Sequence, residues 1–222
     1  AEQVATRLRK GNIVVLESDE DLLLYELGHI PGALKLDWET QMQQPVVRDF
    51  VDKEGFEKLA SERGISNDTT VIFCGDRSNW YATYGFWLFK YYGHEDVRVL
   101  NGGRDLWEKE GRPMTREMPT VTPASYTAKE PDASIRAFRD DVMAFLKTDN
   151  PKLVDVRSNA EYTGELLHAI GYPQEGAMRA GHVKGAVNVP WGTAANEDGT
   201  FKAIDELKQL YEEKGITSDG PV

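Results

Sequence analysis

The chain has 222 residues, of which 40% are hydrophobic, and its 37 acidic and 26 basic residues give a formal net charge of -11. A negative charge of this size repels phosphate backbones and anionic lipid surfaces at long range, which argues against nucleic acid as a partner. The sequence also lacks the roughly 18 consecutive apolar residues of a membrane span, so we expect a soluble globular protein with no membrane partner.

Apolar strands alternate with helices along the first half of the chain. The run Ile-Val-Val-Leu at 13–16 lies between a Gly-Asn pair and an acidic stretch, and it predicts a buried strand. Residues 52–63 carry apolar or small side chains at helical spacing and precede a glycine stop, which predicts a helix. Further strands are predicted at 33–36, 70–74 and 97–100, and further helices at 79–92 and 104–110. Apolar strands that alternate with helices are typical of a parallel sheet covered on both faces.

A polar connection separates this half from a second set of elements. Residues 116–132 contain three prolines, three threonines and few large apolar side chains, so they predict a linker. The expected domains are therefore residues 1–115 and 133–222. The second domain is expected to contain a helix at 137–147 and strands at 153–156 and 186–189.

The two halves repeat one another. Residues 28–38 (GHIPGALKLDW) return as residues 181–191 (GHVKGAVNVPW), and residues 50–71 pair without a gap with residues 201–222. Duplication of a whole domain explains both matches. We therefore expect the two Gly-His turns to have the same structure.

The second copy differs from the first in two respects. Val222 matches Val71, an offset of 151 residues (222 minus 71), so the equivalent of Cys74 falls at position 225 (74 plus 151). We therefore expect the second copy to be incomplete. It also has an insertion between residues 159 and 180, which is either a tolerated surface excursion or a loop that lines a site.

The single cysteine of the chain, Cys74, lies at the end of a predicted strand and before a predicted helix. Backbone N–H groups and the positive end of a helix dipole at such a place lower the pKa of a thiol and make it a better nucleophile. The alternative is a small buried hydrophobic residue, which is what most free cysteines are. One cysteine also excludes an internal disulfide framework and fits a reducing compartment, so we expect a cytoplasmic location.

Few other residues combine into a chemical site. Asp155 and Arg157 follow the first strand of the second copy, at the edge of the sheet where ligands collect in open α/β folds, and a local ion pair is the alternative. His29 and His182 each follow a glycine, and we expect hydrogen bonds that fix the turn rather than catalysis. The histidines, cysteine and acids show no spacing typical of metal ligands, so no metal is expected.

Several motifs together resemble a known family, the two-domain rhodaneses, which are thiosulfate or 3-mercaptopyruvate sulfurtransferases. They are the Gly-His-Ile-Pro-Gly-Ala turn at 28–33, Leu-Asn-Gly-Gly at 100–103, Val-Asp-Val-Arg-Ser at 154–158 and the duplication itself. The resemblance implies an α/β protein of two tandem domains, each with a central, mostly parallel sheet flanked by helices, the second incomplete. It also implies an active cysteine on the strand-to-helix loop of the C-terminal domain.

The resemblance places the family nucleophile just beyond Val222, and Cys74 at the matching position of the domain that is usually silent. Arg77 is present in the loop after Cys74, as in an active loop of the family, but Asp76 adds a negative charge. An adjacent carboxylate raises the pKa of a thiol and disfavours anionic thiosulfate. Cys74 is therefore interpreted as a vestigial thiol. As the single cysteine of these 222 residues, it is also their catalytic candidate.

In the second copy the resemblance implies that Asp155 and Arg157 brace the active loop. Family members also use an arginine a few residues later to bind the substrate anion, but this sequence has Glu161 there. Arg179, directly before the second Gly-His turn, is the nearest substitute. These implied roles make Asp155, Arg157 and Arg179 the substrate-binding candidates.

The function that follows is sulfur transfer by double displacement. A cysteine thiolate takes sulfane sulfur from thiosulfate or 3-mercaptopyruvate and passes it to cyanide or another thiophile, with no metal or organic cofactor. Its partners would be a small-molecule donor and acceptor. A phosphatase on the same fold needs a longer loop than the one after Cys74, and a catalytically silent binding module is the alternative from another class.

Overall fold

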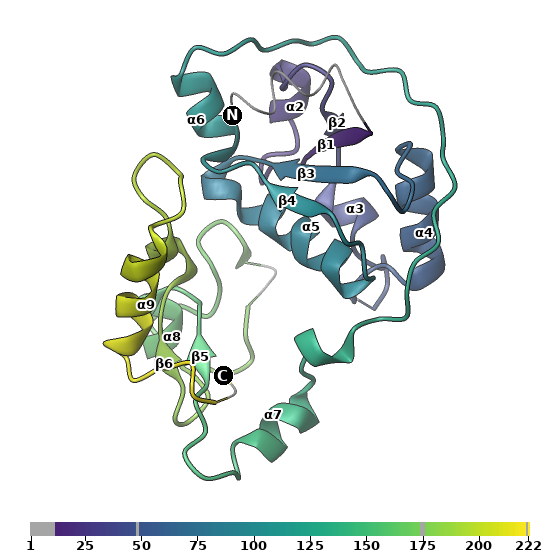
Figure 1. Cartoon of the computed structure of the whole chain (residues 1–222). Coiled ribbons are helices and arrows are strands. Elements are labelled where there is room, and N and C mark those ends of the chain that lie inside the picture. Colours follow the sequence, from purple (N-terminus) through teal and green to yellow (C-terminus); the bar gives the residue numbers. More distant parts are fainter. Residues whose placement is uncertain (1–11, 48, 174–175, 221) are drawn as a thin grey trace. The chain divides into compact units, whose positions relative to one another are not determined.

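The computed structural model describes residues 12–47, 49–173, 176–220 and 222. Internal contacts divide the chain into two compact units (Figure 1). Unit 1 comprises Ala1–Arg136 with Glu197–Thr200, and unit 2 comprises Ala137–Asn196 with Phe201–Val222.

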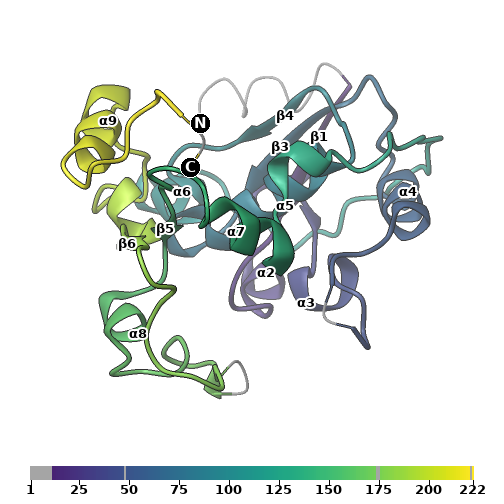
Figure 2. The ribbon, with the colours of Figure 1, turned by 90° about the horizontal axis from the view of Figure 1, so that it is seen from below.

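Unit 1 is built on a four-stranded sheet whose strands are all parallel. In space the strands follow the order β2-β1-β3-β4, and Figure 2 shows β1, β3 and β4 side by side. They are β1 (Ile13–Glu17), β2 (Leu34–Lys35), β3 (Thr70–Cys74) and β4 (Val97–Val99). The predicted parallel sheet is confirmed, and β2 and β4 are shorter than predicted. Because Glu17 pairs with Cys74, the last residues of β1 and β3 lie next to each other.

Helices cover both faces of this sheet, because successive side chains of a strand point to opposite sides. Phe73 contributes to one face, where it packs with Phe56 of α4 and Phe89 of α5. Ile72 contributes to the other face, with Trp107 of α6. The helices of unit 1 are α2 (Leu24–Leu27), α3 (Trp38–Gln41), α4 (Lys53–Glu62), α5 (Trp80–Tyr91) and α6 (Gly103–Lys109), with 3-10 turns at Arg77–Asn79 and Ala133–Ile135.

Residues 116–132, which we call the strap, contain no helix or strand and run along unit 1 (Figure 1). The backbone N–H of Ala124 donates to the carbonyl of Ser61 at the end of α4, and that of Lys129 donates to the carbonyl of Tyr92 after α5. Tyr126 is buried in the core of unit 1. The strap is therefore packed against unit 1 over much of its length, and its role as a boundary between domains stays a prediction.

We expect Gly64→Ala to show how closely the strap approaches. Gly64 has a φ of +69°, and a Cβ there would lie 2.8 Å from the carbonyl oxygen of Thr122 in the strap. Gly111 has a similar φ of +65° with nothing within 4 Å of an added Cβ, so Gly111→Ala carries the backbone strain alone. Chemical denaturation should show Gly64→Ala to be the more destabilising by about 1–2 kcal/mol. Equal losses would contradict a close strap.

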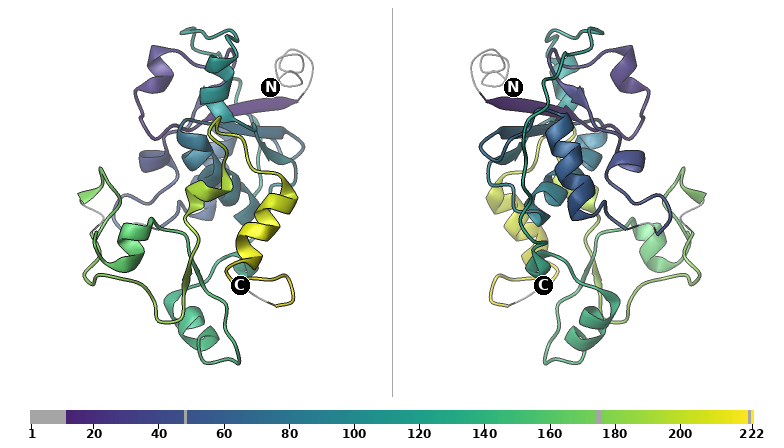
Figure 3. Two further views of the ribbon diagram at one scale, coloured as in Figure 1. Left: turned by 90° about the vertical axis from the view of Figure 1, so that its left-hand side faces the viewer. Right: turned by 90° about the vertical axis from the view of Figure 1, so that its right-hand side faces the viewer.

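Unit 2 has a smaller sheet, in which β5 (Val154–Asp155) pairs in parallel with β6 (Val187–Asn188). Both strands are shorter than predicted, and the predicted helix at 137–147 is confirmed in part. The helices of unit 2 are α7 (Arg139–Phe145), α8 (Asn159–Thr163) and α9 (Ile204–Glu212), with a 3-10 turn at Trp191–Ala194. The last helix, α9, is the yellow helix in Figures 1 and 3. None of the helices in the described ranges of either unit has the length and apolar character to cross a membrane.

The Gly-His turns of the two units make the same contacts with a tyrosine. In unit 1 the ring of His29 stacks on Tyr25 with centroids 3.9 Å apart, and in unit 2 the ring of His182 stacks on Tyr162 at 3.7 Å. Each tyrosine hydroxyl donates to the carbonyl of the alanine that ends its turn, at 2.7 Å and 2.8 Å respectively. The expected equivalence is confirmed for these contacts, whereas the backbone differs at the first glycine, with a φ of +157° at Gly28 and +91° at Gly181.

Candidate active site

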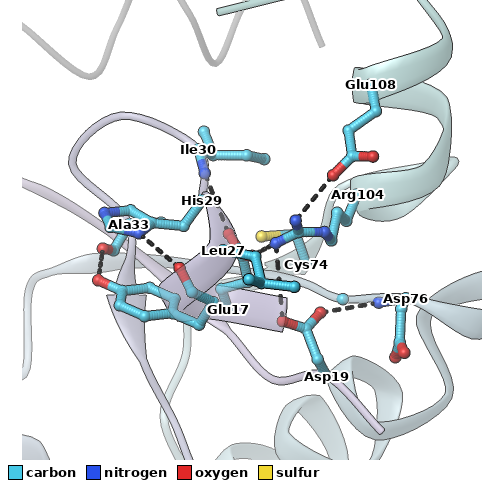
Figure 4. Close-up of polar contacts among 12 residues, drawn as sticks. Glu17, Asp19, Leu27, His29, Ile30, Ala33, Cys74, Asp76, Arg104 and Glu108 are labelled. Carbon is cyan, nitrogen blue, oxygen red and sulfur yellow. Dashed lines mark hydrogen bonds and ion pairs between the residues drawn. The ribbon is translucent and has the colours of Figure 1, made fainter. Parts of the chain in front are cut away.

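The carboxyl ends of β1 and β3 in unit 1 carry a buried cluster of charged side chains (Figure 4). Glu17 is the last residue of β1, Asp19 follows it, and Arg104 reaches them from the first turn of α6. Nη1 of Arg104 lies 2.5 Å from Oε1 of Glu17 and 3.9 Å from Oδ2 of Asp19. All three residues are at most 5% exposed. We call them the Arg104 cluster.

Further groups bind the Arg104 cluster. Nη2 of Arg104 lies 2.8 Å from Oε1 of Glu108 on α6. Oε2 of Glu17 accepts the N–H of Ile30 at 3.2 Å, and Oδ1 of Asp19 accepts the N–H of Asp76 at 3.0 Å. The cluster therefore joins the Gly-His turn, the loop after β1 and the loop after β3.

Two buried carboxyl groups around one guanidinium give an excess of negative charge. Burial raises the pKa of Glu17, although Ile30 and Arg104 act in the opposite direction. Burial, with the neighbouring charges of Glu17 and Asp76, raises the pKa of Asp19 to about 8. Because Arg104 is bonded most closely to Glu17, we infer that Asp19 holds a proton near neutral pH.

Cys74 lies at this cluster but does not have the features of an activated thiol. Its side chain is fully buried, and its Sγ lies 3.8 Å from the carbonyl oxygen of Leu16, to which the S–H donates. Burial raises the pKa of Cys74 well above its usual value, and the charges of Glu17 and Asp19 act in the same direction. Desolvation therefore outweighs any lowering by the dipole of α5, and the structure favours the interpretation of Cys74 as a buried hydrophobic residue.

The carboxylate of Asp76 acts differently from what the sequence suggested. It accepts the N–H groups of Glu20 at 2.6 Å and Asp21 at 3.4 Å, in the loop after β1. The carboxylates that raise the pKa of Cys74 are Glu17 and Asp19, which the sequence analysis did not single out. The only signal available was the acidic stretch directly after an apolar strand.

We expect Cys74 to resist thiol reagents in the native protein. A buried thiol with a raised pKa forms almost no thiolate at neutral pH, and the thiolate is the reactive species. Labelling with iodoacetamide at pH 7.5, followed by mass spectrometry, should modify Cys74 only in denaturant. Val46 is 87% exposed, so the Val46→Cys chain is a control that should take up one label when native. Rapid native labelling of Cys74 would contradict the buried assignment.

Unit 2 places a carboxylate at the position that corresponds to Glu17. In β1 Glu17 pairs with Lys35 of β2, and in β5 Asp155 pairs with Asn188 of β6. The two Gly-His turns are offset by 153 residues (181 minus 28), and the same offset relates Lys35 to Asn188 (35 plus 153). Asp155 is therefore the structural counterpart of Glu17.

The cation beside this carboxylate comes from a different element in each unit. Arg157 donates from Nε to Oδ1 of Asp155 at 3.0 Å and from Nη2 to Oδ2 at 2.6 Å. Nη2 also donates to the carbonyl oxygen of Gly181 at 2.9 Å. The hydrogen bond from Arg157 lowers the pKa of Asp155. The local ion pair suggested by the sequence is confirmed, and its role in bracing an active loop stays a prediction.

The third binding candidate does not join this pair in the structure. Arg179 is exposed, and in the described part of unit 2 it makes no hydrogen bond to Asp155 or Arg157. Glu161 is 8% exposed and belongs to a capping box, in which its carboxylate accepts the N–H of Ser158. Glu161 therefore stabilises the start of α8.

The histidines of the two turns have the structural role predicted for them. Nδ1 of His29 lies 3.0 Å from the carbonyl oxygen of Tyr25, and Nε2 lies 3.1 Å from that of Glu117. Nδ1 of His182 lies 2.8 Å from the carbonyl oxygen of Tyr162. Across residues 12–47, 49–173, 176–220 and 222, no three His, Cys, Asp or Glu side chains form a group that could hold a metal ion.

Comparison with known proteins assigns the family. A family model described as the rhodanese-like domain matches residues 1–110 and again residues 138–221. The chain belongs to the rhodanese-like family. The rhodanese fold, an α/β fold with a parallel sheet flanked by helices, is thereby shown, as the resemblance implied.

Relatives of the rhodanese-like chain include several named for sulfur chemistry. It is 55% identical to the sulfur carrier protein TtuD of Thermus thermophilus. This alignment spans 219 residues and covers 97% of this chain and 77% of that protein. It is also 55% identical to a putative thiosulfate sulfurtransferase of Saccharopolyspora erythraea. This alignment spans 212 residues and covers 96% of this chain and 75% of that protein. Among solved structures, the 3-mercaptopyruvate sulfotransferase SseA of Escherichia coli matches this chain with a TM-score of 0.83, over 99% of this chain and 84% of that one. Because the two sequences are only 22% identical, this match shows the fold alone.

Proposed function

We propose that this rhodanese-like protein is a sulfurtransferase that moves the outer sulfur of thiosulfate, or the thiol sulfur of 3-mercaptopyruvate, to cyanide or another thiophile. The observation that carries the proposal is the 55% identity over 96% of the chain to a putative thiosulfate sulfurtransferase. The duplicated fold and the Asp155–Arg157 pair at the carboxyl edge of the second sheet support it.

The proposed reaction has two displacements on one cysteine. With thiosulfate, the thiolate attacks the outer sulfur, the S–S bond of thiosulfate breaks, and sulfite leaves with the bonding electron pair. The cysteine then carries a persulfide. A thiophile attacks the outer persulfide sulfur, and the thiolate is restored as the leaving group. Such chemistry requires a thiol with a low pKa and hydrogen-bond donors that stabilise the persulfide anion.

Cys74 does not meet these requirements, because it is buried and its pKa is raised. We propose that the thiol that carries the sulfur is at the equivalent position of the second copy, 225 by the repeat offset (74 plus 151). Unit 1 would then act as a packing or binding module, which is the second candidate function for this half of the chain.

The charged residues of unit 2 have a proposed role in holding the anionic donor. Three N–H groups of Arg157 are used by Asp155 and Gly181, while its Nη1 group has no partner in the portion of unit 2 that is described. The side chain is 37% exposed, so Nη1 can donate to a thiosulfate or carboxylate oxygen. Arg179, which is exposed and lies two residues before Gly181, is the proposed second cation.

Mass spectrometry after treatment with thiosulfate tests the proposal. The 222-residue chain should gain no sulfur atom, because Cys74 forms little thiolate. A longer polypeptide that includes the second-copy cysteine and carries Cys74→Ser should gain one sulfur atom and lose it to cyanide. Sulfur on Cys74, together with loss of transfer in the Cys74→Ser protein, would place the active thiol in unit 1 instead.

A further inference from the structure

A buried histidine connects the strap to the rest of unit 1. His94 follows α5 and is 2% exposed, and both of its ring nitrogens have a partner. Nε2 lies 2.9 Å from the carbonyl oxygen of Thr69, and Nδ1 lies 3.1 Å from the hydroxyl oxygen of Tyr126 in the strap. The proposed sulfur transfer does not use this histidine.

The two partners determine where the ring of His94 carries its proton. The carbonyl oxygen of Thr69 can only accept, so Nε2 carries a hydrogen. In the neutral ring Nδ1 then has a lone pair and accepts the O–H of Tyr126. Tyr126 stays protonated, since burial raises its pKa to about 12. A second proton on the ring would turn Nδ1 into a donor. The Tyr126 oxygen would then have to accept, and the hydroxyl hydrogen would lose the buried acceptor that it has on the neutral ring.

Tyr126 is well placed to hold the strap. Its ring is 6% exposed and lies edge-on to Phe56 of α4 at a centroid distance of 5.7 Å. The next residue, Thr127, exchanges two hydrogen bonds with Asn67, and the N–H of Ala128 donates to Glu57 at 2.9 Å. Losing the acceptor of Tyr126 therefore acts on the middle of the strap, where these bonds are concentrated.

The charges that face His94 leave burial as the main influence on its protonation. Burial lowers the pKa of His94, and Lys90 of α5 acts in the same direction. The hydrogen bond to Thr69 and the charges of Asp96 and Glu95 oppose this. Asp96 forms an ion pair with Arg98 on β4, and Glu95 forms one with Lys129 in the strap. The folded protein thus favours the neutral ring more than the unfolded chain does.

We propose that His94 is an acid-sensitive latch, in which the neutral ring holds the Tyr126 hydroxyl and uptake of a proton on Nδ1 loosens the strap. Because the pKa of His94 is lower in the folded protein, the stabilisation is present above the ordinary histidine pKa and is lost as the pH falls through the folded value. The residues that follow the strap have bonds of their own to unit 1, such as the ion pair of Arg136 with Asp49 at 2.6 Å, so the loosening is confined to the strap.

Hydrogen exchange of the 222-residue chain tests the latch. Amides of residues 124–129, corrected for the intrinsic effect of pH, should lose about tenfold more protection than those of β3 between pH 7.5 and pH 5. In the His94→Gln variant the side-chain amide can donate to Thr69 and accept from Tyr126 at either pH, so the strap should keep its protection at pH 5. Nitrogen-15 spectra at pH 7.5 should show the proton of the neutral ring on Nε2.

Two results would overturn the latch. One is a His94→Gln chain whose strap loses protection at low pH as the wild type does, and the other is a neutral ring protonated on Nδ1. If His94→Gln does not fold, Tyr126→Phe decides the question, since it keeps the packed ring and removes the hydroxyl. Its strap should be less protected than the wild type at pH 7.5 and equal to it at pH 5, whereas equality at both values would show that the hydroxyl holds nothing.

Discussion

Replacing Arg104 by methionine is expected to destabilise unit 1 by about 3–5 kcal/mol, because a buried carboxylate that loses the cation paired with it is left uncompensated. Arg104 is 5% exposed, and its Nη1 lies 2.5 Å from a carboxylate oxygen of Glu17, which is 1% exposed. Methionine fills a similar volume without the charge, so the loss reports the electrostatics rather than a cavity. Urea denaturation at pH 7, followed by tryptophan fluorescence, measures it.

A surface pair supplies the control for this prediction. Arg98 lies 2.7 Å from Asp96, and their side chains are 57% and 41% exposed. Solvent screens such a pair, so Arg98→Met should change the stability by less than about 1 kcal/mol. Adding Glu17→Gln to Arg104→Met should recover part of the lost stability, because the glutamine leaves no buried charge. Equal small effects for the two arginines would show that the Arg104 cluster is solvated.

Replacing Asp19 by asparagine is expected to stabilise unit 1 at pH 8 by about 1–3 kcal/mol, the cost of a buried polar group that lacks full compensation. The pKa of Asp19 is raised to about 8 in the folded protein, whereas an unfolded aspartate titrates near ~3.9. A group whose pKa is raised on folding contributes its full share to stability below its pKa in the unfolded chain. That share is lost as the pH rises toward its pKa in the folded protein. Asparagine keeps the acceptor for the N–H of Asp76 and removes this loss.

The pH dependence distinguishes this effect from a general gain in stability. The Asp19→Asn and wild-type chains should have equal stability near pH 4 and diverge as the pH rises to 8, as followed by urea denaturation at each pH. Asp96 is the opposite case, because its hydrogen bond from Arg98 lowers its pKa. Asp96→Asn should therefore lose stability at neutral pH relative to pH 3. A constant difference between Asp19→Asn and the wild type would contradict a proton held by Asp19.

Much of the fold could be predicted because it depends on local pattern. The strands at 13–16 and 70–74 could be predicted from short apolar runs, since a strand covered on both faces must be apolar throughout. The duplicated Gly-His turns could be recognised because their contacts lie within a few residues, with Tyr25 bonded to Ala33 and stacked on His29. The pairing of Asp155 with Arg157 followed in the same way from their separation of two residues.

What the sequence could not show depends on residues that are distant along the chain. Arg104 and Glu17 are separated by 87 positions along the chain, and His94 and Tyr126 are separated by 32 positions. No local sequence pattern therefore predicts either contact. The position of Cys74 between a strand and a helix suggested an activated thiol. Its pKa is instead raised by burial and by the charges of Glu17 and Asp19, and these two residues lie beside Cys74 only because β1 pairs with β3. Sequence alone therefore determined the elements and their duplication, because these arise from local periodicity. Tertiary structure alone decided which charges are buried together, because desolvation acts on a side chain only after the chain has folded around it.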